Sequence, residues 1–371
     1  MWKIDYSKVQ NYENEYLKYL ELAESNTNGS ENNKTIKQKL EDKNNEWGNI
    51  KKEIISLRKQ CGLDEKLPKQ YEKDFKQILL ADFEELLRIY VDFENLQDKC
   101  KQKNIIIKKE NDTDNEELFE RIEKCFDYDS YSSLIAKFFI KYQKELRIAS
   151  CFYCDTGYIN IIPGTKNNNG IEYRLFETDH IIAKKQCPIL ALSLKNFVPS
   201  CKICNSSTIK GQTNFLELYK IEKPIDEEKI KLLAKLSPSS SLYNYDSNVK
   251  ISVLPEKKEG IDWFPTNDFY HNPDFYRIKF IHYDEDYRKA TEAFKLEERY
   301  NYGEHLAEAL NLLDLQKRYT KSNIQYIAKI LNKSGRNTII TEEQIYEDIF
   351  HKSLNHDTGR IFAKLKKDIL E

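Results

Sequence analysis

Two matched cysteine motifs decide how this chain folds locally: Cys151-Phe152-Tyr153-Cys154 and Cys201-Lys202-Ile203-Cys204. A C-x-x-C pair presents two thiolates to one ion from a tight turn, and two such pairs complete the tetrahedral ligand set of zinc. Because sulfur would fill all four positions, we expect a structural zinc ion. The 46 residues between the motifs exceed a simple zinc ribbon, so a small subdomain should lie between them. Buried thiols or a redox pair are the alternative, which the match between the two motifs disfavours.

Length and composition limit the classes of protein that remain. The chain has 371 residues, enough for two or three domains and a sizeable core. Its mean hydropathy is -0.73, no apolar run approaches the ~20 residues of a membrane span, and its start does not resemble a signal peptide. We therefore expect a cytoplasmic protein with no membrane association. Four other cysteines without ligand spacing suit reduced thiols in that compartment: Cys61, Cys100, Cys125 and Cys187.

The charge balance argues against a general coat for nucleic acid. The net charge is -2, so binding to a polyanion would have to be local. Residues 151–210 hold seven Lys or Arg against four Asp or Glu. The segment between the cysteine motifs is thus the modestly basic part of a nearly neutral chain.

Hydrophobic periodicity predicts four segments. Residues 1–148 and 284–371 should be helical, residues 149–218 should form the cysteine-bounded unit, and residues 219–283 should be mixed. Apolar stripes at helical spacing run from Phe75 to Phe93 and from Tyr131 to Leu146. The sequence Thr341-Glu342-Glu343-Gln344 fits a helix capping box. Strands are expected over residues 158–162, 171–176, 249–254 and 275–283, with a loop over 163–170 between the first two.

Residues capable of phosphodiester chemistry stand in order between and just after the cysteine motifs. The stretch Glu177-Thr178-Asp179-His180-Ile181-Ile182-Ala183-Lys184 comes first, Asn196 follows it, and Asn205 directly follows the last cysteine. Hydrolysis of a phosphodiester needs a base to deprotonate water and a cation to neutralise the developing charge. His180 is the expected base, since a neutral imidazole titrates near operating pH. Asp179 and Asn205, the latter at a helix start, offer hard oxygen ligands to Mg²⁺ or Mn²⁺.

This ordered set resembles the HNH endonucleases, whose ββα-metal finger carries a D-H pair, an intervening Asn and a His or Asn opening the helix. The wider pattern is similar to the zinc-bearing HNH nuclease of Septu-type anti-phage defence systems, which works beside an ATPase. The resemblance implies an α+β protein, mainly helical, with a central zinc-stabilised HNH finger. It implies a metal-dependent endonuclease acting on nucleic acid, DNA more than RNA, and a partner ATPase or other defence-complex protein.

Other roles follow from the same resemblance and from charge. Asn196 should hold the histidine-bearing loop in register through backbone hydrogen bonds. Glu177 should help to orient Asp179 and His180 without binding metal or substrate itself. Three lysines are expected to contact substrate phosphates without reading bases: Lys184, Lys185 and Lys210.

Weaker alternatives stay open on the sequence. A lone Asp-His pair in a strand is usually solvated or hydrogen-bonded, and a lysine on a loop is usually just solvated. A zinc-stabilised nucleic-acid-binding or adaptor module with an idle nuclease centre is the second interpretation. A helical scaffold that carries the finger as a small insert is the third.

Overall fold

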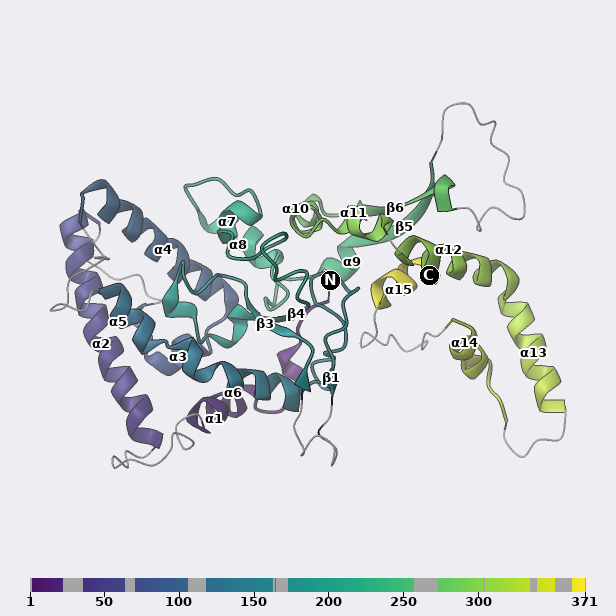
Figure 1. Cartoon of the computed structure of the whole chain (residues 1–371), viewed down its shortest axis with the longest axis horizontal. Helices are drawn as coiled ribbons and strands as arrows, with labels where there is room; N and C mark the ends of the chain where they lie inside the picture. Colours follow the sequence, from purple (N-terminus) through teal and green to yellow (C-terminus); the bar gives the residue numbers. More distant parts are fainter. Residues whose placement is uncertain are drawn as a thin grey trace. The chain divides into compact units, whose positions relative to one another are not determined.

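The computed structural model describes residues 2–22, 36–63, 71–105, 118–162, 164, 173–256, 273–302, 304–333, 339–350 and 362–370. These residues are mainly helical and contain three two-stranded antiparallel sheets, β1–β2, β3–β4 and β5–β6 (Figure 1). The predicted mainly helical α+β class is confirmed at this level. Most of the loop expected over residues 163–170 lies outside the described residues.

The chain divides into two compact units. The finger unit comprises residues 3–148 and 159–243, and the C-terminal unit comprises residues 1–2, 149–158 and 244–371. This division differs from the four segments expected from the sequence. Residues 159–218 group with the N-terminal helices, whereas residues 149–158 group with the C-terminal helices.

Helices make up most of the finger unit. They are α1 (Tyr12–Leu22), α2 (Ile36–Cys61), α3 (Phe75–Leu79), α4 (Phe83–Gln102), α5 (Leu118–Cys125), α6 (Tyr128–Lys141), α7 (Phe215–Leu218) and α8 (Glu227–Lys235). Helix α1 packs on α6, α2 on α5 and α4 on α8. Their apolar stripes meet in an aromatic core in which the Phe126 ring contacts the rings of Trp47 and Phe75, and all three are almost fully buried.

The stripe from Phe75 to Phe93 forms two helices, not the single helix that the sequence suggested. Helix α3 ends at Leu79, and Asp82 then takes an extended backbone as the N-cap of α4. The Glu85 side chain accepts a hydrogen bond from the Asp82 backbone N–H at 3.2 Å. This reciprocal cap stabilises a new helix start and keeps the apolar face in phase on both sides of the break.

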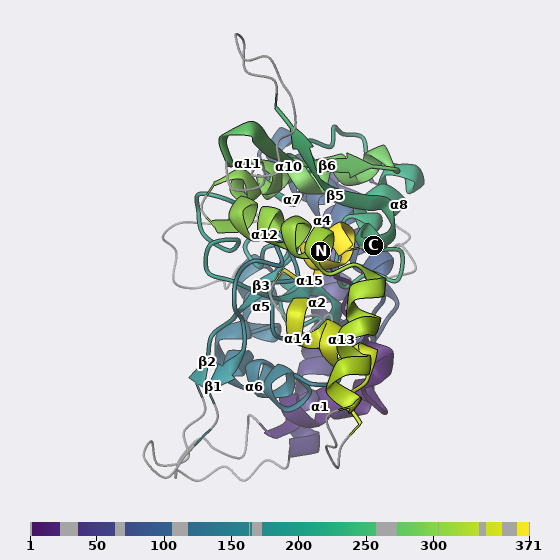
Figure 2. The same ribbon diagram turned by 90° about the vertical axis from the view of Figure 1, so that its right-hand side faces the viewer.

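Two short sheets follow in the finger unit. Strand β1 (Ile161–Ile162) pairs with β2 (Tyr173–Arg174), and β3 (Glu177–His180) pairs with β4 (Phe197–Ser200). Both views in Figures 1 and 2 place β1 beside α6. The helix expected to start at Asn205 is absent from the described residues 201–214. Successive turns run there instead, and Gly211 has φ +49, a left-handed conformation that interrupts a helix.

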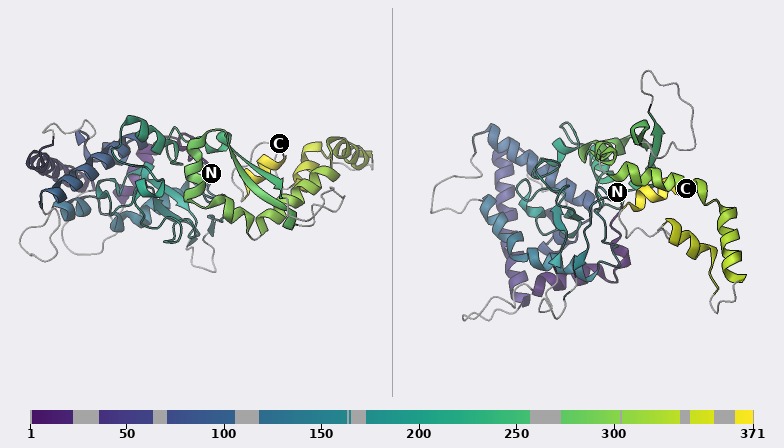
Figure 3. Two further views of the ribbon diagram at one scale, coloured as in Figure 1. Left: turned by 90° about the horizontal axis from the view of Figure 1, so that it is seen from above. Right: turned by 45° about the vertical axis from the view of Figure 1, so that its right-hand side comes forward.

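The C-terminal unit is built on a two-stranded ribbon, seen along its length in Figure 3. Strand β5 (Val249–Pro255) pairs with β6 (Tyr276–His282) along seven residues, so both predicted strands are confirmed. The short helix α9 (Tyr245–Asn248) precedes β5. Six helices follow β6 in the described part of this unit: α10 (Arg288–Ala293), α11 (Leu296–Asn301), α12 (Glu304–Arg318), α13 (Lys321–Lys333), α14 (Glu342–Phe350) and α15 (Ala363–Leu370). The predicted capping box at Thr341 is present, with reciprocal bonds to Gln344 of 2.9 and 3.1 Å.

A buried carboxylate caps the last helix of this unit. Asp155 is fully buried and accepts hydrogen bonds from Trp2 Nε1 at 3.1 Å, Ser150 Oγ at 2.6 Å and the Lys364 backbone N–H at 2.7 Å. The last of these is an unpaired donor in the first turn of α15. Asp155 therefore ties residues from three distant parts of the chain through one side chain.

Replacing Asp155 with Ala should loosen α15. The change removes the cap and leaves buried donors unsatisfied, so the opening free energy of α15 should fall by about 2–4 kcal/mol. Hydrogen exchange of residues 362–370 measures this opening free energy. The metal content of the protein should stay unchanged. As a control, Asp226→Ala removes an exposed cap of α8 and should loosen that helix by only about 1 kcal/mol. Equal exchange of α15 in wild type and Asp155→Ala would show that the cap is dispensable.

Candidate active site

Strand β3 presents Asp179 and His180 on opposite faces. The two residues are neighbours in an extended strand, in which successive side chains alternate between faces. Across the sheet, Asp179 pairs with Val198 and His180 pairs with Phe197. The Asp179 side chain is buried, whereas His180 is half-buried.

The His180 ring is fixed on its own face by three contacts. Its Nε2 lies 3.0 Å from the backbone oxygen of Ala191. The Tyr128 ring, at the start of α6, meets it edge-on with centroids 4.5 Å apart, and the Phe197 ring lies at 4.8 Å. A backbone carbonyl can only accept, so Nε2 carries the hydrogen and Nδ1 keeps the lone pair. This is the tautomer that a general base needs at Nδ1.

Burial keeps this imidazole neutral. It lowers the pKa of His180 to about 4, and the positive charges of Lys210 and Lys184 act in the same direction, while the bond to Ala191 opposes them. The ring is therefore uncharged at neutral pH. A neutral imidazole can accept a proton from water, but a pKa of about 4 makes it a weaker base than the group titrating near operating pH that the sequence predicted.

Asn196 holds the loop that follows His180. Its side chain is fully buried, its Oδ1 accepts from the Ile182 N–H at 2.9 Å, and its Nδ2 donates to the carbonyls of Ile182 and Leu190 at 3.0 Å each. The Asn196 carbonyl also accepts from the Ile181 N–H at 2.9 Å. An amide is needed here, because the side chain must both accept and donate. These are backbone bonds of the kind expected from the sequence.

Asp179 forms a buried ion pair with Lys210. Lys210 Nζ lies 2.8 Å from Asp179 Oδ1 and 2.6 Å from the carbonyl oxygen of His180. The side chains of the two partners are only 4% and 3% exposed. Lys210 thus neutralises the carboxylate beneath β3. The sequence suggested that Lys210 contacts a substrate phosphate. Its buried position does not place it for that contact.

The oxygen donors proposed for Mg²⁺ do not form a metal site by themselves. Asp179 and Asn205 are of the right chemical type, but the carboxylate contacts an ammonium group, and the Asn205 side chain makes no hydrogen bond to any described residue. Glu177 is half-buried and lies on the Asp179 side of β3. We therefore assign no reaction step to a metal ion at these residues.

A hollow of about 600 Å³ lies next to residues that contact His180, although His180 itself does not line it. Tyr128 and Ala191, which both contact His180, are among its lining residues, as are Lys184 and Lys185. Lys184 is held there by an ion pair with Asp129 at 2.6 Å and lies 5.1 Å from the Tyr128 ring centroid. Lys185 is exposed. Two of the three predicted phosphate contacts thus line the same hollow as Tyr128 and Ala191.

The four predicted zinc ligands come together. The sulfur atoms of Cys151, Cys154, Cys201 and Cys204 all lie within 4.8 Å of one another, and all four residues are buried. Tetrahedral zinc with Zn–S bonds of ~2.3 Å separates its sulfurs by about 3.8 Å, so the arrangement fits this ion. Within the described parts of the chain, no other group of three or more His, Cys, Asp or Glu side chains is close enough to share a metal.

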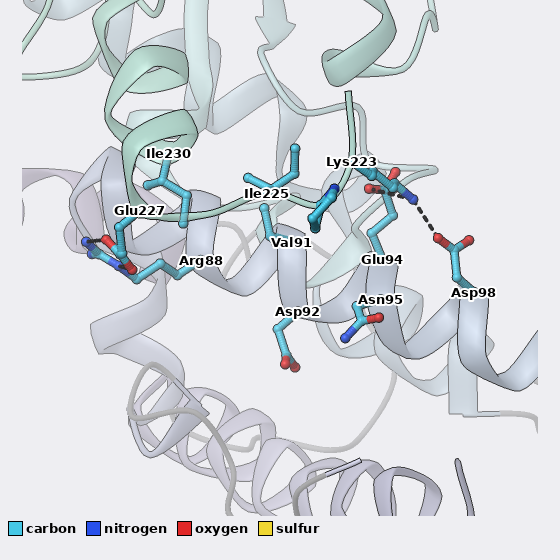
Figure 4. Close-up of a pocket in the computed structure, with 11 residues that line it drawn as sticks. Arg88, Val91, Asp92, Glu94, Asn95, Asp98, Lys223, Ile225, Glu227 and Ile230 are labelled. Atoms are coloured by element: carbon cyan, nitrogen blue, oxygen red, sulfur yellow. Dashed lines mark hydrogen bonds and ion pairs between the residues drawn. The ribbon is translucent and has the colours of Figure 1, made fainter. Parts of the chain in front are cut away.

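A second hollow in the finger unit has no predicted site residue on its walls. It measures about 640 Å³ and lies between α4 and the segment 223–230 (Figure 4). Figure 4 shows the apolar side chains in its lining, Val91 from α4 and Ile225 and Ile230 from the segment 223–230. Ion pairs close it on two sides, Arg88 with Glu227 at 2.8 Å and Lys223 with Asp98 at 2.5 Å. Its charged groups are already paired, and we assign it no chemistry.

Tyr128 is the residue near His180 that sequence reasoning missed. It lies 52 positions before the histidine, in a segment whose periodicity indicated only a helix. The local signal was the N-cap Asp127, which fixes the start of α6 and so places Tyr128 at its first turn. No sequence spacing indicated that this turn would face His180.

Comparison with known proteins gives no relative for this chain: no family model, curated protein or solved structure matches it. Among the described helices, none is sufficiently long and apolar to cross a membrane.

Zinc should be bound in a one-to-one ratio and should stabilise the protein. Apparent binding energies for structural zinc are ~10–16 kcal/mol, comparable to the stability of a whole domain. Cys204→Ser should lose the metal and lower the melting temperature by more than 10 °C (roughly, from a loss of several kcal/mol). Cys125→Ser, outside the cluster, is the matched control and should retain the metal. Metal analysis that finds no zinc in the wild-type protein would contradict the assignment.

The Asp179–Lys210 pair should show strong coupling in a double-mutant cycle. Lys210→Met leaves a buried carboxylate uncompensated and should destabilise the finger unit by about 3–5 kcal/mol in urea denaturation. The double variant Asp179→Asn/Lys210→Met removes both charges and should recover most of that loss. Lys185→Met, at an exposed position, should change stability by less than about 0.5 kcal/mol. A double variant as unstable as Lys210→Met would contradict the ion pair.

Proposed function

We propose that this protein is an HNH-type endonuclease that hydrolyses phosphodiester bonds of nucleic acid, DNA more than RNA, with the help of Mg²⁺ or Mn²⁺. The observation that carries the proposal is the His180 arrangement. A neutral imidazole has its Nε2 fixed by a backbone carbonyl and lies on a strand pair that the zinc-ligand cysteines flank in sequence. The role in anti-phage defence and the partner ATPase rest on the sequence resemblance alone.

The proposed chemistry gives each residue one task. His180 Nδ1 takes a proton from the attacking water. Asn196 holds the loop that follows His180, which keeps the imidazole oriented toward that water. Lys184 and Lys185, on the neighbouring hollow, hold the substrate backbone. A bound divalent ion would supply charge neutralisation at the phosphate and leaving oxygen. The ligands of this ion are not assigned, because Asp179, one of the two expected ligands, is paired with Lys210 on the face of β3 opposite His180.

The decisive experiment is cleavage by the full chain. Wild type is incubated with Mg²⁺ or Mn²⁺ and plasmid, single-stranded DNA or tRNA. His180→Ala should reduce the cleavage rate at least about 100-fold, because general-base catalysis contributes ~10²–10⁴. His282→Ala is the matched control: this histidine bonds Thr291 in the C-terminal unit and should leave cleavage unchanged. Equal rates for wild type and His180→Ala contradict the proposed mechanism.

A zinc-stabilised nucleic-acid-binding or adaptor protein is the second candidate function. The Asp179–Lys210 ion pair favours it, because it occupies a carboxylate that a metal-dependent nuclease would use. This candidate predicts that oligonucleotide binding persists in the presence of EDTA and in His180→Ala, with no cleavage by wild type under any of the metal conditions above.

A further inference from the structure

The basic side chains of the finger unit differ in whether they form ion pairs. Three lysines are in ion pairs: Lys184 with Asp129, Lys195 with Asp82, and Lys210 with Asp179. A substrate phosphate must compete with a carboxylate for each of these. Arg174, by contrast, makes no ion pair with any acidic side chain that the structure describes, and it is exposed at the end of β2.

Arg174 is nevertheless held in a defined position. Its Nη1 donates to Thr178 Oγ1 at 3.1 Å, and its guanidinium lies 5.9 Å from the centroid of the Phe176 ring. Thr178 is itself buried on β3. This hydrogen bond, the one that the guanidinium makes to the described residues, uses one of five N–H donors, so the rest of the group remains available for a further acceptor. A positioned cation loses less conformational entropy on binding than a lysine on a loop.

The strand geometry places this cation on the His180 side of the sheet. Thr178 and His180 are two residues apart on β3, so their side chains share a face, about 7 Å apart along the strand. Tyr128, whose ring touches His180, also lies within reach of the arginine charge: burial raises the pKa of Tyr128, and Arg174 lowers it. Figure 2 shows β2 close to α6, the helix that begins at Tyr128. Arg174, Tyr128 and His180 therefore border one surface.

We propose that Arg174 binds a backbone phosphate of the nucleic-acid strand beside the phosphodiester bond that the water activated by His180 attacks. This inference rests on the proposed nuclease function, and it assigns a residue that charge counting alone did not single out. The planar guanidinium matches two oxygens of one phosphate, and the contact would position the strand without selecting its sequence. Thr178 acts as a positioning residue, since it fixes the guanidinium and does not touch the substrate.

The test compares Arg174→Gln with Lys202→Gln in the full chain. Both changes remove one exposed positive charge, but Lys202 makes no hydrogen bond or ion pair with the described residues. Binding of a fluorescent single-stranded oligonucleotide in EDTA is measured from 50 to 200 mM salt. Arg174→Gln should weaken binding about 10-fold at low salt and reduce the slope of log K against log salt by roughly 0.7, the value for one phosphate contact. Lys202→Gln should change affinity less than 2-fold.

Two further variants separate positioning from simple charge. Arg174→Lys keeps the charge and should recover the salt slope but only part of the affinity, because an ammonium lacks the bidentate fork. Thr178→Val keeps the arginine and removes its acceptor, and should weaken binding about 3-fold with an unchanged salt slope. Thermal unfolding of all variants checks that the fold is retained.

Cleavage kinetics distinguish failure of this inference from failure of the proposed function. If wild type cleaves, His180→Ala does not, and Arg174→Gln lowers kcat/KM about 10–100-fold, the inference is supported. If Arg174→Gln cleaves and binds like wild type while His180→Ala is inactive, the nuclease stands and the role of Arg174 is wrong. If wild type does not cleave, the proposed function fails. Separately, a salt slope for Arg174→Gln equal to that of wild type overturns the phosphate contact.

Discussion

The pairing of β3 with β4 is the constraint on which the whole candidate site depends. Four residue pairs hold the two strands together, and the side chains of Asp179 and His180 leave them on opposite faces. On one face the Asp179–Lys210 ion pair fastens the later turns to β3. On the other face Tyr128 and Phe197 enclose the imidazole. Asn196 closes the connection between the strands by bonding to Ile182 at the start of the intervening loop and to Leu190 farther along it. A shift of register by one residue would exchange the two faces and destroy both arrangements.

Much of the fold followed from local patterns in the sequence. The apolar stripes indicated the helical segments that became α3, α4 and α6, the strand signals indicated β5 and β6, and the capping box marked the start of α14. The break between α3 and α4 was missed although its signal, Asp82 followed three residues later by Glu85, was present, because the apolar stripe continues through it. The helix expected at Asn205 came from the resemblance and not from any capping or periodic signal. Turns around Gly211 replace it.

The sequence predicted which cysteines share a metal site, but not which residues contact Asp179 and His180. The cysteine spacing indicated a metal cluster, and the four sulfurs do lie together. The partner of Asp179 could not be derived, because a lysine 31 residues away is an ordinary surface residue by sequence and becomes a buried counter-ion only through tertiary packing. The same holds for Tyr128, which reaches His180 from a helix in another part of the chain. This ion pair is also the feature on which the nuclease and the adaptor interpretations differ most sharply.

A structure of the full chain with an oligonucleotide carrying a non-cleavable phosphorothioate, in the presence of Mn²⁺, tests the central claim most directly. The account predicts a backbone phosphate on the Tyr128 side of β3, with a water in line for attack at hydrogen-bond distance, ~2.6–3.2 Å, from His180 Nδ1. A nucleic acid bound elsewhere, or His180 Nδ1 engaged by the protein itself in that complex, would contradict it.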